Sequence, residues 1–316
     1  MRRLLKYWQN NKQKILITIG VIVFVFICIQ VANEIVKQQT ANQPNIQNTI
    51  TAQDVTKPEE PIITEKPLKE TEKEENAQFI ANFVKLCNEK KIEEAYGLLS
   101  DACKEELYRD IGTFTNNYIN SIFSSAKEYS LELWSTFDDD TTYRITYYEG
   151  NLLQTGGNTS GSNFVDYITI VEENNILKLN IGKMISKETK NQIGENQGIQ
   201  VTVQTRSVYM DYEIYRITVK NNTNNTILLN DGTASDIVLI DEKDNEYSSL
   251  VYELPMSSLT LEAGYQKSFN LKFNKMYNAS SQIRNMEIRN IYLNKAQYDA
   301  NQNQEDIETT TIQIKL

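Results

Sequence analysis

The chain has 316 residues, a net charge of −10, three cysteines and no histidine. An acidic chain is a poor partner for nucleic acid, because binding to phosphates needs clustered lysine and arginine. The absence of histidine excludes Ser-His and Cys-His catalytic pairs and histidine-ligated zinc, and three cysteines are too few for a disulfide scaffold.

The N-terminal residues combine a basic flank with a long uncharged run. Residues 1–14 carry five basic and no acidic side chains, and Ile15 to Asn33 are all uncharged. At about 1.5 Å per residue, this run approaches the ~30 Å hydrocarbon core of a bilayer. A cleaved signal peptide is the competing interpretation, but its apolar core spans only about 7–15 residues before a small-x-small site. The sequence predicts a cytoplasmic tail over 1–14, one helix in the lipid bilayer over 15–36, and an extracytoplasmic location for all later residues.

A polar segment follows the predicted membrane helix. Four of the five prolines, Pro44, Pro58, Pro61 and Pro67, lie here among Gln, Asn, Thr, Glu and Lys. Such a composition buries too little apolar surface to offset the entropy of the chain. Residues 37–70 are therefore predicted to be a disordered linker.

Helical spacing begins after Thr71-Glu72-Lys73-Glu74, which fits a capping box, and Ser100 is typical of a further N-cap. From Tyr129 the apolar period changes to two, which predicts strands near 129–137, 141–149, 163–172 and 176–183. The helical set of apolar residues is Phe79, Ile80, Phe83, Val84, Cys87, Ile92, Ala95, Tyr96, Leu98, Leu99, Phe114, Tyr118, Ile119 and Ile122. Helices followed by an antiparallel sheet predict an α+β domain over 71–190.

This order of elements, with Ala95-Tyr96-Gly97-Leu98-Leu99-Ser100 followed by Phe114 and Tyr118, resembles the nuclear-transport-factor-2-like (cystatin-like cone) superfamily. The resemblance implies a curved sheet that wraps around helices and often leaves a pocket. The superfamily includes enzymes, ligand binders and interaction modules, so the resemblance alone assigns no function.

After a polar bridge, Ser186 to Gln197, the chain alternates apolar and polar residues to its end. Further strands are expected at 199–203, 215–219, 237–240, 247–252, 268–273, 286–293 and 310–316, which predicts a β-sandwich over 198–316. The stretch Tyr215 to Leu229 resembles small immunoglobulin-like domains of bacterial surface proteins, which act as spacers or as adhesion and assembly modules. The predicted fold class is a single-pass membrane protein with an α+β cone-like domain and an all-β immunoglobulin-like sandwich.

No metal or cofactor site is predicted. Asp138-Asp139-Asp140 lies in an expected hairpin, and Asp241 to Asn245 lacks the glycine and terminal glutamate of an EF-hand loop. Gly156 to Gly161 is not followed by the Lys-Ser or Lys-Thr of a phosphate loop. Each of these segments is interpreted as a turn or a loop.

Asp166 is the carboxylate that could serve a pocket, because strand parity places it on the face of Ile168 and Ile170. On that face it could act as a desolvated acid or base beside Tyr147 or Arg144. The alternative is an aspartate at a strand end that reaches solvent or an ion pair. Cys87 lies on an apolar helix face, and we expect Cys87 and Cys103 to be unbridged.

The leading functional hypothesis is a non-enzymatic scaffold that contacts other envelope proteins. An N-terminal anchor, a linker and a cone domain also resemble bitopic assembly factors of bacterial conjugation and type IV secretion channels, whose usual pattern lacks the C-terminal sandwich. The alternatives are a module that binds a small ligand in the cone pocket, and a cone-fold hydrolase or isomerase.

Overall fold

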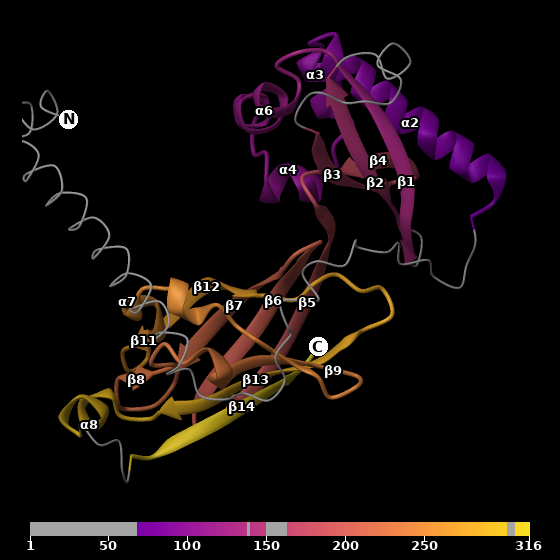
Figure 1. Ribbon diagram of the computed structural model, residues 1–316. Helices are drawn as coiled ribbons and strands as arrows, with labels where there is room; N and C mark the ends of the chain where they lie inside the picture. Colours follow the sequence, from indigo (N-terminus) through magenta and orange to yellow (C-terminus); the bar gives the residue numbers. More distant parts are fainter. Residues whose placement is uncertain (1–67, 138–139, 150–162, 302–306) are drawn as a thin grey trace, which may run out of the picture. The chain divides into compact units, whose positions relative to one another are not determined.

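Figure 1 shows the computed structural model, which describes residues 68–137, 140–149, 163–301 and 307–316. The first part contains a layer of helices and an antiparallel sheet in the order β1-β2-β3-β4. Its elements are α2 (Glu70–Asn88), α3 (Ile92–Gly97), α4 (Asp101–Glu106), α5 (Ile111–Phe114), the π-helical turn η1 (Thr115–Ile119), α6 (Asn120–Ile122), β1 (Lys127–Phe137), β2 (Asp140–Glu149), β3 (Phe164–Glu173) and β4 (Ile176–Asn180).

The helices cover one face of this sheet. Phe83 and Cys87 of α2 are fully buried in the same apolar cluster as Ile145 of β2 and Ile168 of β3. Asn76 is buried and donates to the Tyr143 hydroxyl, whereas none of the charged residues of α2 is buried, as expected for an amphipathic helix. Its apolar stripe supplies the contact that holds the helical layer on the sheet.

The helix starts differ in how well the sequence predicts them. Helix α2 begins at Glu70, near the expected start, but its capping box is wrong by two residues, because the N-cap is Lys69, whose backbone N–H donates to Glu72 at 3.1 Å. Ser100 does cap α4, because its hydroxyl accepts from the backbone N–H of Cys103 at 2.9 Å. That prediction is confirmed.

The later residues form two further antiparallel sheets that share an apolar core. One has the strand order β12-β7-β6-β5, and the other has the order β10-β9-β13-β8-β11, with β14 paired to β13. The strands are β5 (Met184–Asn196), β6 (Ile199–Tyr209), β7 (Glu213–Asn221), β8 (Ile227–Leu228), β9 (Ile237–Asp241), β10 (Glu246–Ser248), β11 (Thr260–Leu261), β12 (Gln266–Phe273), β13 (Ile283–Tyr292) and β14 (Thr309–Lys315), with short helices η2 (Ala234–Asp236), η3 (Val251–Glu253), α7 (Met256–Leu259) and α8 (Lys295–Ala300).

The expected polar bridge Ser186 to Gln197 is wrong, because most of it belongs to strand β5, which pairs with β6 along its length. The residues of β5 are mostly polar, so they carry no period-2 apolar signal, yet their backbone completes the sheet. All described residues belong to one compact unit. The sequence thus missed the strand that leads from the first part into the second.

The fold class predicted from the sequence is wrong as a whole. The described residues form mostly antiparallel β-sheet with few helices, several of them only one turn long. Among these residues, no helix combines the length and the apolar character needed to cross a membrane. The expected tail, membrane segment and most of the linker, residues 1–67, lie outside the described residues.

Strand β5 approaches the C-terminal strand β14 closely at Gly194. A Cβ atom there would lie 2.7 Å from the carbonyl oxygen of Gln313 and 2.7 Å from the side chain of Ile314. We expect Gly194→Ala to lower the free energy of unfolding by about 1–3 kcal/mol, because overpacking forces the two strands apart. Gly97→Ala is the matched control, since a Cβ there meets no atom within 4 Å. Equal unfolding midpoints for the two variants in a denaturant titration would contradict this contact.

Candidate functional site

Asp166 of β3 lies in the interior of the first part, 1% exposed, and its carboxylate accepts four hydrogen bonds. Tyr118 Oη donates to Oδ2 at 3.0 Å, and the backbone N–H groups of Tyr167, Gly182 and Lys183 donate at 2.8, 3.1 and 2.9 Å. The strand parity in the sequence therefore placed this side chain on the correct face. The alternative, a strand-end aspartate in solvent or in an ion pair, is wrong.

Two tyrosine hydroxyls extend this contact into the core. Tyr118 Oη lies 3.1 Å from Tyr147 Oη, and both side chains are almost completely buried. Burial raises the pKa of both tyrosines well above 10. Both hydroxyls are therefore neutral donors at physiological pH, and neither is a candidate base.

The environment of Asp166 favours a structural role over proton transfer. Burial raises the pKa of the carboxyl, and the hydrogen bonds from Gly182, Tyr167, Tyr118 and Lys183 limit that rise. Each oxygen already accepts two internal donors, so a substrate group would have to displace one of them. A general acid or base must instead reach the proton of its substrate directly or through one water.

Arg144 does not belong to this cluster. It points to the opposite face of β2, where its guanidinium lies 3.3 Å from Glu132 and 5.9 Å from the centre of the Trp134 ring. Adjacent residues on a strand face opposite sides, so Arg144 and the buried Ile145 separate in this way. Of the three predicted site residues, the structure brings together Asp166 and Tyr147, through Tyr118, and leaves Arg144 outside.

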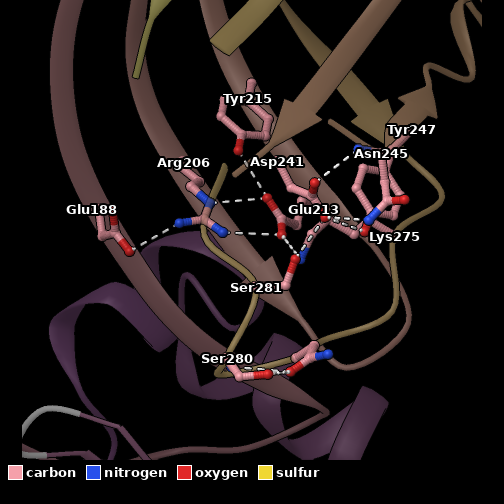
Figure 2. Close-up of polar contacts among 11 residues, drawn as sticks. Glu188, Arg206, Glu213, Tyr215, Asp241, Asn245, Tyr247, Lys275, Ser280 and Ser281 are labelled. Atoms are coloured by element: carbon pink, nitrogen blue, oxygen red, sulfur yellow. Dashed lines mark hydrogen bonds and ion pairs between the residues drawn. The ribbon is translucent and has the colours of Figure 1, made fainter. Parts of the chain in front are cut away.

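A second buried carboxylate, Glu213 at the start of β7, is the centre of the network in Figure 2. Arg206 of β6 donates to both of its oxygens, from Nε at 2.9 Å and from Nη2 at 3.0 Å. Tyr215 Oη donates at 2.8 Å, and Lys275 Nζ lies 3.0 Å from Oε1. Burial alone would raise the pKa of Glu213, but the hydrogen bonds and charges of Arg206 and Lys275 lower it below 4.5.

The network joins the segment after β12 to the sheet. Lys275 is 2% exposed and also lies over the ring of Tyr247, 5.6 Å from its centre. A pocket of about 30 Å³ beside Arg206 and Lys275 has room for roughly two water molecules. The charges of Arg206, Glu213 and Lys275 are thus paired with one another beside a space of water size.

Asp241, at the end of β9, is a third buried carboxylate with internal donors (Figure 2). The backbone N–H groups of Lys243 and Asn245 donate to Oδ1, both at 2.9 Å. The side chains of Asn245, Tyr247 and Ser281 donate to Oδ2 at 2.9–3.0 Å. Burial would raise the pKa of Asp241, but these hydrogen bonds lower it overall. The sequence predicted a turn at Asp241 to Asn245, and the structure shows one, but it did not predict that Asp241 is buried and closes the turn.

A polar groove of about 370 Å³ lies between α4 and the β5–β6–β7–β12 sheet. Lys187 of β5 crosses it to reach Glu105 at 2.8 Å and Glu106 at 2.7 Å. The buried Oε1 atom of Gln204, also in the groove lining, accepts no hydrogen bond from the described residues. Most ligand pockets are lined by apolar residues, whereas the lining of this groove is mostly charged or polar. The groove is therefore suited to a small, highly polar ligand.

The described residues contain no group of three or more His, Cys, Asp or Glu side chains that could hold a metal ion. Asp138, Asp139 and the glycine-rich loop 156–161 lie outside them. Cys87 and Cys103 are both buried and unbridged, which confirms the expectation for this pair. Burial raises the pKa of both thiols to about 12, so neither is a nucleophile at neutral pH.

Sequence reasoning missed Tyr118 as a partner of Asp166 and missed the Glu213 network entirely. A signal for Glu213 exists in the chain, because Glu213, Tyr215, Ile217 and Val219 share one parity and the last three are apolar. Lys275 lies in an irregular segment between β12 and β13, where no period indicates burial.

We expect Asp166→Asn to destabilise the chain by about 2 kcal/mol, because either orientation of the amide places an NH₂ group against backbone or hydroxyl donors. Glu172→Gln on the same strand, where the side chain is exposed, is the matched control and should change stability by less than about 0.5 kcal/mol. Urea unfolding of both variants measures this. A destabilisation by Asp166→Asn no larger than that of the control would show that the four hydrogen bonds carry little weight.

Glu213→Gln should destabilise by about 3–5 kcal/mol, because it leaves Lys275 buried without its counter-charge and leaves Arg206 with Glu188 alone, at 3.4 Å. The pKa of Glu213 is lowered, so its contribution is complete above pH 4.5 and is lost as the pH falls through the folded value. The variant should therefore show a shallower loss of stability on acidification than the unchanged chain. Glu246→Gln, which breaks a half-exposed pair with Arg289, is the control, with an expected cost of at most about 1 kcal/mol.

Comparisons with known proteins add little to this description. No protein-family model matches the chain, and no curated protein matches it. A crystal structure of a conserved hypothetical protein from Bacillus anthracis is similar at 20% identity over 28% of this chain and 81% of that chain, with a TM-score of 0.23. At this TM-score the similarity assigns neither a fold nor a function to the chain.

Proposed function

We propose that this chain is a non-enzymatic scaffold or assembly protein that contacts other proteins outside the cytoplasm, in a secretion or conjugation complex. The observation that supports it most is the saturation of the buried carboxylates. Asp166, Glu213 and Asp241 each accept several internal donors, which leaves none of them available to a substrate. The location and the type of complex rest on the N-terminal sequence and the order of elements alone.

The first test compares two neighbouring tyrosines in cells that lack the chromosomal gene. Tyr147→Phe removes a buried hydroxyl 3.1 Å from Tyr118 in the Asp166 cluster, and Tyr148→Phe removes a partly exposed hydroxyl bonded to Ser130. A scaffold predicts that both variants restore function, with a stability cost of about 1 kcal/mol for Tyr147→Phe. Loss of function with Tyr147→Phe at a normal protein level would contradict the proposal.

A scaffold must also be found in a complex larger than itself. Mild chemical cross-linking in cells followed by native electrophoresis should place the chain in a heteromeric species. Migration as a free monomer under conditions in which its function is required would count against the proposal.

The polar groove beside Lys187 supports a second candidate function, the binding of a small polar ligand. The groove volume, the Lys187 ion pairs and the unbonded Gln204 oxygen favour it. Gln204→Leu removes that acceptor without touching the ion pairs. Loss of cellular function in this variant, with normal folding, would favour the ligand binder over the scaffold.

A further inference from the structure

Strand β1 is an open edge of its sheet. It runs for 11 residues and, among the described strands, pairs with β2 alone. An edge strand exposes a row of backbone N–H and C=O groups that can pair with another extended chain. Most proteins shorten or cover such an edge, so an open edge of this length is unusual.

At one end of this edge, a side chain of α2 makes the two hydrogen bonds that a neighbouring strand would make. The Asn88 amide accepts from the backbone N–H of Lys127 and donates to its C=O, both at 2.9 Å. Lys127 therefore turns its backbone groups away from β2. Because this orientation alternates in an antiparallel pair, Tyr129, Leu131 and Leu133 also turn their backbone groups outward, up to the bulge between Leu133 and Ser135. No described residue outside β1 hydrogen-bonds to these groups.

The edge adjoins a groove of about 300 Å³ between α2 and β1. Ala81 and Val84 of α2 and Tyr129 of β1 form its apolar lining. Residues directly opposite each other on neighbouring strands point to the same face of a sheet. A residue that pairs with Tyr129 would therefore direct its side chain into this groove.

The other face of β1 is acidic. Glu128, Ser130 and Glu132 alternate with the half-buried apolar residues and are exposed. Glu128 has no ion-pair partner among the described residues, whereas Glu132 lies 3.3 Å from Arg144. Opposite charges directly across a strand pair stabilise it, and like charges destabilise it. A second copy of β1 in antiparallel pairing about Ser130 would place Glu128 opposite Glu132, so self-pairing in this register is disfavoured, whereas a basic partner strand has no such repulsion.

We propose that β1 is the docking edge for an extended segment of a partner protein in which basic and apolar residues alternate. The segment adds a strand whose backbone bonds to Tyr129, Leu131 and Leu133. Its apolar side chains face the groove beside α2, and its lysine or arginine side chains lie over Glu128 and Glu132. This inference rests on the proposed function, because it names the partner chemistry of the scaffold.

The test measures binding of a fluorescein-labelled peptide of alternating lysine and valine to the purified full chain by fluorescence anisotropy. The valines pair with the outward-facing residues of β1, so their N–H groups point toward it, whereas the lysine N–H groups point away. N-methylation of the valines should weaken binding about tenfold, equivalent to about 1.4 kcal/mol. N-methylation of the lysines should change it by less than about twofold. Both changes are made in the peptide, so the protein is the same in the two measurements.

Matched protein variants test the charge pattern. Glu128→Lys should weaken binding of the alternating peptide, and Glu172→Lys on the interior strand β3 should not. Equal binding of the N-methylvaline peptide, or of a peptide with the same residues in separate lysine and valine blocks, would overturn the proposal by showing charge attraction only. A different result would also overturn the proposal: the chain forms a dimer, Glu128→Lys strengthens that dimer, and the peptide dissociates it. The edge would then belong to a second copy of the chain. This assay uses isolated protein. Absence of peptide binding would therefore contradict the docking edge, while cross-linking in cells would still decide whether the chain belongs to a complex.

Discussion

The fold of the first part depends on the capture of one carboxylate by the backbone of a tight turn. Gly182 and Lys183 adopt positive φ angles of 67° and 65°, so their successive N–H groups converge on Asp166. A Cβ at position 182 would lie 2.8 Å from the hydroxyl of Tyr108, which leaves space for glycine alone. This turn is where the chain leaves β4 and enters β5. Asp166 thus connects β3 to the turn between β4 and β5. The hydrogen bond from Tyr118 connects the same carboxylate to the helical layer.

The same device recurs in the later strands with different donors. Glu213 is held by two cations and a tyrosine, and Asp241 by amides and hydroxyls of its own turn and of Ser281. In each case a buried carboxylate joins elements that are distant in sequence, and the donors offset the desolvation of its charge. An interior built in this way is specific in its connections but poor in reactive groups.

Much of the strand pattern was predictable, because half-buried antiparallel strands alternate with period two. Nine strands and most of a tenth lie where the sequence predicted strands: β1, β2, β3, β6, β7, β9, β12, β13 and β14, and β4, which ends three residues before the expected end. Strand β5 was not predictable, since its polar residues carry no alternation and its pairing is set by the backbone of β6. Parity placed Asp166 on the correct face, but its partners come from η1 and from a turn, and periodicity does not relate distant segments. For the same reason the sequence could not reveal that Lys275 reaches Glu213.

The two buried thiols have a practical consequence for any study of this chain. Cys87 and Cys103 are fully enclosed and remain protonated at neutral pH, so they do not compete for maleimides, spin labels or oxidants while the chain is folded. A cysteine placed by mutation at an exposed position of β1 or β3 would be the sole reactive thiol among the described residues. Two introduced cysteines, one on each strand, would allow a distance measurement that follows movement of the sheet edge. Labelling of Cys87 or Cys103 would in turn indicate that the chain has unfolded.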